Sequence, residues 1–352
     1  MKALVLSGGS GTRLRPLSYS MPKQLIPIAN KPVLEYVLES IRALGVTEIA
    51  IIVGNWAVEI ADVIGDGSRF GATISYIHQD RPLGLAHCVA LARPFLGDDD
   101  FVMYLGDNLL PDGVVEIADE FRCGRPAAHV VLHKVLDPRA FGVAELDEDG
   151  TVLRLVEKPR RPRSDLALIG VYFFTPAIHE AVDAIAPGPR GELEITDAIQ
   201  WLVARGAVVR ASVYGGYWKD TGRVEDILDG NRRLLADLPG GVLGSVDAAS
   251  VVDGAVVVAP GARVVRSRID GPAVVGANTV IEDSHIGPNT AIGRDCVLRR
   301  TRVADSIVLD GASILEAHGL QGSLIGRHAT IRPGAAHQRL VVGDHTHIEL
   351  AA

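Results

Sequence analysis

The chain has 352 residues, 47% of them hydrophobic and 22% charged, which is typical of a globular protein long enough for two domains. Its formal net charge is −8 at pH 7, which excludes a surface that is positively charged overall. We therefore expect neither nucleic acid nor an anionic membrane as a partner. No run approaches the roughly 18–20 apolar residues of a membrane span, and three widely spaced cysteines without a leader pattern favour a cytoplasmic protein with no cysteine metal site.

A short apolar run at residues 2–6 predicts a buried strand that leads into a glycine-rich loop. Gly8, Gly9 and Gly11 let the backbone approach a ligand closely and point its N–H groups towards it. The loop is not a dinucleotide fingerprint, because Leu14 stands where a third spaced glycine is required, and it also lacks the signature of a P-loop. Taken alone, the loop could equally be a structural turn between a strand and a helix.

Two cations behind the loop favour a phosphate site. Arg13 offers a planar fork of donors suited to phosphate oxygens, and Lys23, next to Gln24, adds a second positive charge. An acidic protein that binds a triphosphate needs such a local cluster. The segment therefore predicts binding of the phosphate chain of a nucleotide.

The first two-thirds of the chain alternates short apolar runs with helical patterns, which predicts an α/β fold with a Rossmann-like, mostly parallel sheet. We expect further strands at residues 49–53, 74–77, 101–105, 128–132, 141–146, 152–156, 168–174 and 207–214. We expect helices from Pro32 to Leu44, at 59–64 and 84–96, from Pro176 onward, and at 225–235.

The pattern changes after residues 238–241, and we place a domain boundary there, giving domains of residues 1–238 and 239–352. Aliphatic residues then recur at intervals of 6, 5 and 6, so that each position repeats every 17 residues. One aliphatic residue per side of a three-sided coil predicts a parallel β-helix, whereas an irregular β-sandwich would not repeat regularly every 17 residues. The repeating positions are Val258, Val264, Ile269, Val275, Ile281, Ile286, Ile292, Leu298 and Val303, continued by Leu309, Leu315 and Leu320.

Two aspartates follow predicted strands of the first domain. Asp107 comes after the buried strand 101–105, and Asp220 follows the last strand of the sheet. Ligands bind outside the carboxyl ends of parallel strands, and Mg²⁺ prefers one or two carboxylates completed by phosphate oxygens and water. Asp107 could instead cap a turn or a helix.

Together these motifs resemble the sugar-1-phosphate nucleotidyltransferases, and the repeat makes the chain similar to their long-form thymidylyltransferases, which carry a left-handed β-helix of hexapeptide type. The resemblance implies Mg²⁺-dependent transfer from dTTP to α-D-glucose 1-phosphate for deoxysugar pathways, including those of antibiotics. A transferase that uses UTP, ATP or GTP with another sugar or cyclitol phosphate is the alternative. The resemblance rests on Gly8–Pro16, Pro22–Ile28, Asn30–Pro32, Leu83–His87 and Gly191–Thr196.

The resemblance also implies residue roles. It makes Arg13, Lys23 and Lys158 catalytic and assigns the metal to Asp107 and Asp220. The amides of Gln24 and Gln79 would read the N3–H and O4 edge of the base, within a nucleotide set of Gly8, Gly9, Gly11, Thr12, Arg13, Lys23, Gln24, Gln79 and Gly84. The sugar phosphate would contact Asn108, Gly142, Glu157, Lys158, Leu168, Arg190 and Trp218.

Two other classes of function stay open at this stage. The β-helix could carry an acyltransferase site, although fewer than five coils are clear in the sequence. The chain could also be a catalytically inactive regulatory subunit, although the expected phosphate and metal residues are all present. We interpret Glu192 and Glu194 as solvated residues at a helix start capped by Thr196, and we expect a homo-oligomer, because a β-helix leaves ends and faces to be covered.

Overall fold

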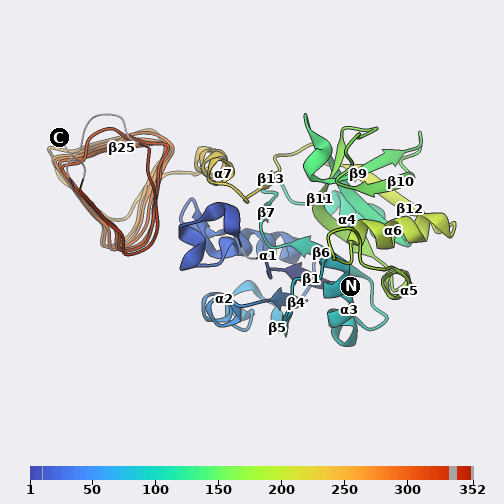
Figure 1. The fold of residues 1–352 in the computed structure, drawn as a ribbon. Coiled ribbons are helices and arrows are strands. Elements are labelled where there is room, and N and C mark those ends of the chain that lie inside the picture. Colours follow the sequence, from blue (N-terminus) through green and yellow to red (C-terminus); the bar gives the residue numbers. More distant parts are fainter. Residues whose placement is uncertain (10, 333–338, 350–352) are drawn as a thin grey trace. The chain divides into compact units, whose positions relative to one another are not determined.

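The computed structural model describes residues 1–9, 11–332 and 339–349, and the chain divides into two compact units (Figure 1). The first, here the α/β unit, comprises residues 1–9 and 34–220. The second, here the β-helix unit, comprises residues 10–33 and 221–352. The predicted boundary at 238 thus differs from this division, which groups the segment behind the glycine loop with the C-terminal coils.

The α/β unit is built on one mixed sheet that runs β10-β9-β11-β6-β1-β4-β5, with β8 joined to β11 and β12 joined to β8. Strands β1, β4, β5 and β6 are mutually parallel, as predicted, whereas β11 is antiparallel to β6. The strands are β1 (Lys2–Leu6), β4 (Glu48–Val53), β5 (Thr73–His78), β6 (Phe101–Leu105), β8 (Ala128–Lys134), β9 (Gly142–Leu146), β10 (Val152–Glu157), β11 (Leu166–Phe174) and β12 (Val209–Val213).

Helices pack on this sheet through apolar stripes. Helices α3, α5 and α6 pack against one another, and their buried side chains share a core with inward residues of β1, β4, β6 and β8. The helix predicted from Pro32 begins one residue later, because Lys31 and Pro32 pair as a strand. The helices are α1 (Val33–Ala43), α2 (Ala57–Ile64), α3 (Leu85–Leu96), α4 (Val115–Gly124), α5 (Ala177–Ala184) and α6 (Ile195–Ala204).

The β-helix unit has three all-parallel sheets, which form the three sides of the predicted left-handed β-helix, seen end-on in Figure 1. The first holds β14 (Gly241–Val242), β17 (Val256–Val258), β20 (Ala273–Val275), β23 (Thr290–Ile292), β26 (Ile307–Val308), β29 (Leu324–Ile325) and β31 (Val341–Val342). The second holds β15 (Ser245–Val246), β18 (Arg263–Val265), β21 (Val280–Glu282), β24 (Val297–Arg299), β27 (Ser313–Leu315), β30 (Thr330–Arg332) and β32 (His347–Glu349). The third holds β16 (Val251–Asp253), β19 (Arg268–Asp270), β22 (His285–Ile286), β25 (Arg302–Ala304) and β28 (Leu320–Gln321).

The 17-residue phase is confirmed where the repeat is regular. Val258 pairs with Val275, and Val275 pairs with Ile292, and all three side chains lie in the buried core of the coils. The next coil is one residue shorter, since Ile292 pairs with Val308. Consequently Val308 and Ile314 take the core positions that we predicted for Leu309 and Leu315, whereas Leu320 is in the core as predicted. The β-helix has more coils than the fewer than five that are clear in the sequence, because the first two sheets each have seven strands.

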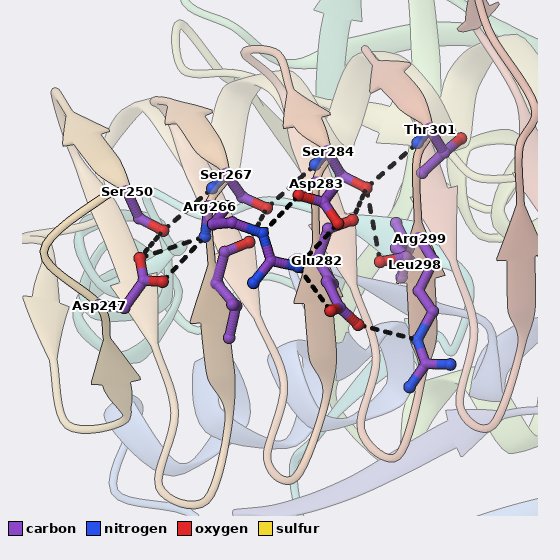
Figure 2. Close-up of polar contacts among 11 residues, drawn as sticks. Asp247, Ser250, Arg266, Ser267, Glu282, Asp283, Ser284, Leu298, Arg299 and Thr301 are labelled. Atoms are coloured by element: carbon purple, nitrogen blue, oxygen red, sulfur yellow. Dashed lines mark hydrogen bonds and ion pairs between the residues drawn. The ribbon is translucent and has the colours of Figure 1, made fainter.

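Side-chain hydroxyls stack along one corner of the coils (Figure 2). The Oγ of Ser250 accepts from the backbone N–H of Ser267 at 3.0 Å, and the Oγ of Ser267 accepts likewise from Ser284 at 3.0 Å. The Oγ of Ser284 then accepts from the N–H of Thr301 at 3.1 Å. Each donor lies 17 residues beyond its acceptor, so a buried N–H that no strand ladder uses is satisfied by the neighbouring coil.

The remaining elements of the β-helix unit lie outside the coils. They are three short 3-10 turns, η1 (Thr12–Leu14), η2 (Leu17–Tyr19) and η3 (Lys23–Leu25), the hairpin β2 (Pro27–Ile28) and β3 (Lys31–Pro32), and helix α7 (Val224–Ala236). Helix α7 packs against both β2 and β23. The hairpin is therefore tied to the coils through α7.

Candidate active site

The pairing of two short strands brings the segments that carry the two predicted metal aspartates next to each other. Strands β7 (Asn108–Leu109) and β13 (Lys219–Asp220) are antiparallel, and Asp220 is the partner of Asn108. Asp107 lies in the turn between the carboxyl end of β6 and the start of β7. Asp107 is buried, and its Oδ1 lies 3.3 Å from Asn108 Nδ2. The backbone thus sets one carboxylate just before β7 and the other at the end of its partner strand β13.

A cavity of about 240 Å³ opens beside this pair within the α/β unit. Trp218 donates from Nε1 to Asn108 Oδ1 at 2.6 Å, and its ring packs edge-on against Phe141 with centroids 5.4 Å apart. These contacts fix the indole and the amide at the cavity wall. All seven predicted sugar-phosphate residues line this cavity, namely Asn108, Gly142, Glu157, Lys158, Leu168, Arg190 and Trp218, and Asp220 lines it too.

Glu157 is the centre of the charged network in the cavity. Its Oε1 lies 3.2 Å from both Lys158 Nζ and Arg190 Nη2. Its Oε2 accepts from Thr196 Oγ1 at 3.3 Å. Lys158 has a left-handed backbone (φ 41°), a conformation that a non-glycine residue adopts only where its surroundings hold it. The arrangement presents cationic groups, half exposed, next to a carboxylate that can accept hydroxyl hydrogens.

Two residues of this network were misjudged from the sequence. Glu194 is buried and accepts from Arg190 at 2.6 Å, so it is not the solvated residue that we predicted. Burial raises the pKa of Glu194, and the hydrogen bond from Arg190 opposes that shift. Thr196 does not cap helix α6, because it is the second residue of the helix and bonds to Glu157. Arg190 and Glu194 lie in the loop before α6, so the i,i+4 rule for helices gave no signal for their pair.

Gly142 occupies a position where a side chain has no room. A Cβ there would lie 2.6 Å from Leu168 Cδ1 and 2.7 Å from Thr196 Cγ2. Leu168 is itself buried in the core, and it lines the cavity beside Gly142. The absent side chain leaves the cavity floor open to a ligand at this point.

The predicted nucleotide residues fall in both units. In the α/β unit, a Cβ on Gly8 would lie 3.2 Å from Gln79 Oε1, so the glycine loop and this amide are neighbours. Gln79 is buried, and its Nε2 lies 3.0 Å from His87 Nδ1. Gly84 has a further reason to be glycine, since its φ is 105° and a Cβ would meet the backbone oxygen of Leu193 at 2.3 Å. The exposed Gly9 also belongs to this unit.

The rest of the nucleotide set belongs to the β-helix unit. Gly11 has a φ of 61°, and a Cβ there would lie 3.4 Å from Lys23 Cβ, so the first and last of the three turns approach each other. Thr12 and Arg13 are exposed on η1, and Lys23 is half-buried on η3. Gln24 is buried, and its Oε1 has no hydrogen-bond partner in the described part of the chain. A buried acceptor of this kind favours a ligand that donates to it.

The chemistry of the donor set fits a hard divalent cation. Within the described residues no group of three or more histidine, cysteine, aspartate or glutamate side chains could hold a metal. Two carboxylates on paired strands, Asp107 and Asp220, are what a magnesium ion uses when phosphate oxygens supply the other ligands. A site of this type forms fully only with the substrate phosphates present.

Comparison with known proteins identifies the class. The family model described as nucleotidyl transferase matches residues 2–237. The chain therefore belongs to the nucleotidyl transferase family, as its motifs predict, and is an enzyme of that family. Enzymes of this family are generally metal-dependent.

The relatives define the type of transferase more narrowly. A glucose-1-phosphate thymidylyltransferase from Streptomyces antibioticus is 60% identical over 269 residues, 76% of either chain. One of the same name from Streptomyces griseus is 58% identical over 268 residues, again 76% of either chain. A crystal structure from Bacillus anthracis, assigned as a glucose-1-phosphate thymidylyltransferase and solved with a sucrose, superposes with a TM-score of 0.63 at 32% identity, covering 68% of this chain and 97% of that one.

In the ranges that the structure describes, every helix is too short or too polar to cross a bilayer.

Proposed function

We propose that the protein is a glucose-1-phosphate thymidylyltransferase that converts dTTP and α-D-glucose 1-phosphate to dTDP-glucose and pyrophosphate. The observation that carries this proposal is the cavity of the α/β unit, where a carboxylate, two cations and an amide fixed by Trp218 face one small volume. The cavity suits a hydroxyl-rich, singly phosphorylated ligand. The names of the Streptomyces relatives support the choice of sugar and base.

The reaction asks for positioning and charge stabilisation rather than a protein nucleophile. A phosphate oxygen of glucose 1-phosphate forms a bond to the α-phosphorus of dTTP. The bond from that phosphorus to the oxygen bridging the α- and β-phosphates breaks, and pyrophosphate leaves with the bonding electrons. No general base is required, because the attacking phosphate monoester is already an anion.

The cavity residues divide these tasks. Lys158 neutralises the sugar phosphate, and the Oε atoms of Glu157 accept hydrogen bonds from sugar hydroxyls. Arg190, which lies 3.2 Å from Glu157, holds that carboxylate in place and adds positive charge. Asn108 contacts the sugar, with its amide oriented by the 2.6 Å bond from Trp218.

The nucleotide is bound by the remaining predicted residues. Gly8, Gly9, Gly11 and Thr12 offer backbone N–H groups to the phosphates, and Arg13 and Lys23 stabilise the negative charge of the leaving pyrophosphate. Gln24 and Gln79 read the base, with Gly84 as a backbone contact. Asp107 and Asp220 would hold Mg²⁺, which would supply positive charge to the phosphates of the two substrates.

One substrate panel tests the proposal. Pyrophosphate release is measured for five nucleoside triphosphates against several sugar 1-phosphates, each with Mg²⁺. We expect the highest kcat/KM for dTTP with glucose 1-phosphate. A preference for UTP, ATP or GTP, or for another sugar, would replace the proposed substrates but leave the enzyme class unchanged.

We also propose that residues 1–238 form the catalytic domain, that residues 239–352 form a separate β-helix domain, and that the chain assembles as a homo-oligomer. Support comes from the family model, which ends at residue 237. Exposed apolar side chains at the first coil, such as Leu243 with 75% of its surface accessible, favour a covered surface. Sedimentation of the full chain would give the oligomer order.

A further inference from the structure

The segment that carries Arg13 and Lys23 has little structure of its own. Residues 11–25 form three turns of 3-10 helix, each three residues long. Backbone hydrogen bonds close each turn, for example from the N–H of Leu14 to the oxygen of Gly11 and from that of Leu25 to the oxygen of Pro22. Such short turns are marginal unless tertiary contacts hold them.

A late coil of the β-helix provides one such contact. Arg327 donates from Nη2 to the backbone oxygen of Ser20 at 3.2 Å. The same guanidinium donates from Nε to Asp344 Oδ2 at 2.9 Å, and the backbone N–H of Arg327 donates to Asp344 Oδ1 at 2.7 Å. The Asp344 carboxylate is only 2% exposed. This buried carboxylate fixes the plane of the guanidinium, so that one N–H points at the peptide between η2 and η3.

The neighbouring coil contacts the other end of η2. A Cβ on Gly343 would lie 3.4 Å from Pro16 Cβ, which is van der Waals distance. Pro16 precedes η2, and Ser20 follows it. The coils therefore hold η2 on both sides, midway between the turn that carries Arg13 and the turn that carries Lys23.

A second anchor holds the hairpin that follows. The N–H of Ala29 donates to Asn231 Oδ1 at 2.9 Å, and Asn231 Nδ2 donates to the oxygen of Asn289 at 3.0 Å. Asn30 donates directly to the oxygen of Ile292 at 2.6 Å. Asn231 is 1% exposed, so loss of either bond would leave a buried polar group unsatisfied. The segment is thus tied to the coils before and after Lys23.

We propose that the β-helix is a positioning device for the nucleotide segment, and that Arg327 is a positioning residue that sets residues 11–25 for binding the triphosphate of dTTP. The inference rests on the proposed function in so far as Arg13 and Lys23 bind that triphosphate. Arg327 itself touches no substrate in this scheme. The C-terminal coils then contribute to affinity for the nucleotide through the segment that they hold.

The chain contains a matched control for this contact. Arg294 makes the same pair with Asp310, from its backbone N–H at 3.0 Å and from Nε at 3.0 Å. Its side chain is 69% exposed, and within the described residues it makes no hydrogen bond to the segment 11–33. Replacing Arg294 therefore removes a corner arginine–aspartate pair without touching the nucleotide segment.

The test compares R327M and R294M in the full chain. Since a hydrogen bond from a charged donor is lost, we expect R327M to raise KM for dTTP by at least about fivefold. KM for glucose 1-phosphate should stay within about twofold, whereas kcat should fall, because Arg13 and Lys23 also stabilise the leaving pyrophosphate, and R294M should resemble the parent protein. An equal change in KM for both substrates, or an equal effect of both variants, would mean a purely structural role and would overturn the proposal.

Hydrogen–deuterium exchange provides a readout that does not need activity. In R327M we expect faster exchange of the amides of Leu14, Tyr19 and Leu25, with unchanged exchange in the sheet of the α/β unit, whereas R294M should leave all of them unchanged. Unchanged exchange in R327M would refute the positioning role. If the parent protein fails to turn over any nucleotide, the proposed function is wrong, and the exchange experiment still decides whether Arg327 orders the segment.

Discussion

The sugar cavity and the β-helix differ in how far apart along the chain their contacting residues lie. In the β-helix, most polar contacts join residues one coil apart, such as the serine ladder with its separation of 17. In the cavity, Trp218 bonds to Asn108 across 110 residues, and Arg190 reaches Glu157 across 33. One region is organised by repetition, and the other is organised by strand pairing between distant segments.

Because of this difference, we expect substitutions in the β-helix to affect mainly stability and substitutions in the cavity to affect mainly the reaction. A repeated coil distributes its stabilising contacts over many equivalent positions, so we expect single substitutions there to change the free energy of unfolding more than the reaction. The cavity concentrates unlike charges at one edge of a sheet, and substitutions there should change turnover more than folding. The predictions below test this contrast, from the largest expected effect to the smallest.

The largest effect is expected at the metal pair. Asp107→Asn or Asp220→Asn should reduce kcat by at least about a hundredfold, because each removes a carboxylate that would hold the Mg²⁺ whose positive charge stabilises the transition state. The melting temperature should stay within a few degrees of that of the parent. Single-turnover kinetics with calorimetry would measure both. Asp183→Asn, which breaks an exposed 2.7 Å pair with Arg93, is the control, and near-normal turnover in both site variants would remove these aspartates from the metal role.

The next effect is expected at Lys158. Lys158→Met removes the charge that faces Glu157 at 3.2 Å, and kcat/KM for glucose 1-phosphate should fall roughly ten- to a hundredfold. Steady-state kinetics at saturating dTTP would measure it. The exposed Lys134, at the end of β8, gives a matched control, Lys134→Met. Equal losses in the two variants would contradict a specific contact with the sugar phosphate.

A smaller effect, on stability alone, is expected in the serine ladder (Figure 2). Ser284→Ala leaves the buried N–H of Thr301 without its 3.1 Å acceptor, at a cost of about 1–3 kcal/mol in the free energy of unfolding. Urea denaturation would measure the loss, and kcat should not change. A variant with normal stability but impaired turnover would reverse the contrast drawn between the two regions.

The smallest effect concerns the pH dependence of stability. Burial raises the pKa of Glu194 above its ordinary value of 4.5, so the folded state holds this proton more tightly than the unfolded state does. The stabilisation that this gives is complete below pH 4.5 and is lost as the pH rises through the raised pKa. Glu194→Gln should therefore flatten the pH dependence of the free energy of unfolding just above pH 4.5. A curve parallel to that of the parent would contradict the shift.

Much of the fold was predictable because it depends on local pattern. The strands around Leu4 and Met103 are continuous apolar runs, and buried parallel strands require such runs. The coils were predictable because one aliphatic residue must point inward on each side. The 17-residue repeat gave the wrong inward residues at Val308 and Ile314, because one coil there is a residue shorter. The sequence Ile-Val-Leu around Val308 does not show which of the three aliphatic residues points inward.

The candidate site was predictable only in its list of residue types. The residues predicted to contact the sugar phosphate all line one cavity, but their partners do not follow from the sequence. Glu194 and Thr196 have ordinary roles at a helix start, and only the approach of α6 to the end of β10 gives them Glu157 and Arg190 as neighbours. A side chain's solvation depends on what packs over it, which a local pattern does not contain.

By itself, the sequence determined the alternation of strands and helices, the repeating coil and the glycine-rich loop with its two cations, because each is fixed by spacing over a few residues. The tertiary structure alone decided that Asp220 pairs with Asn108, and that the segment 11–33 contacts the C-terminal coils. Both depend on contacts between segments more than a hundred residues apart, such as Arg327 with Ser20 across 307 residues. Their free energy comes from complementary packing and paired polar groups, which exist only once the chain has folded.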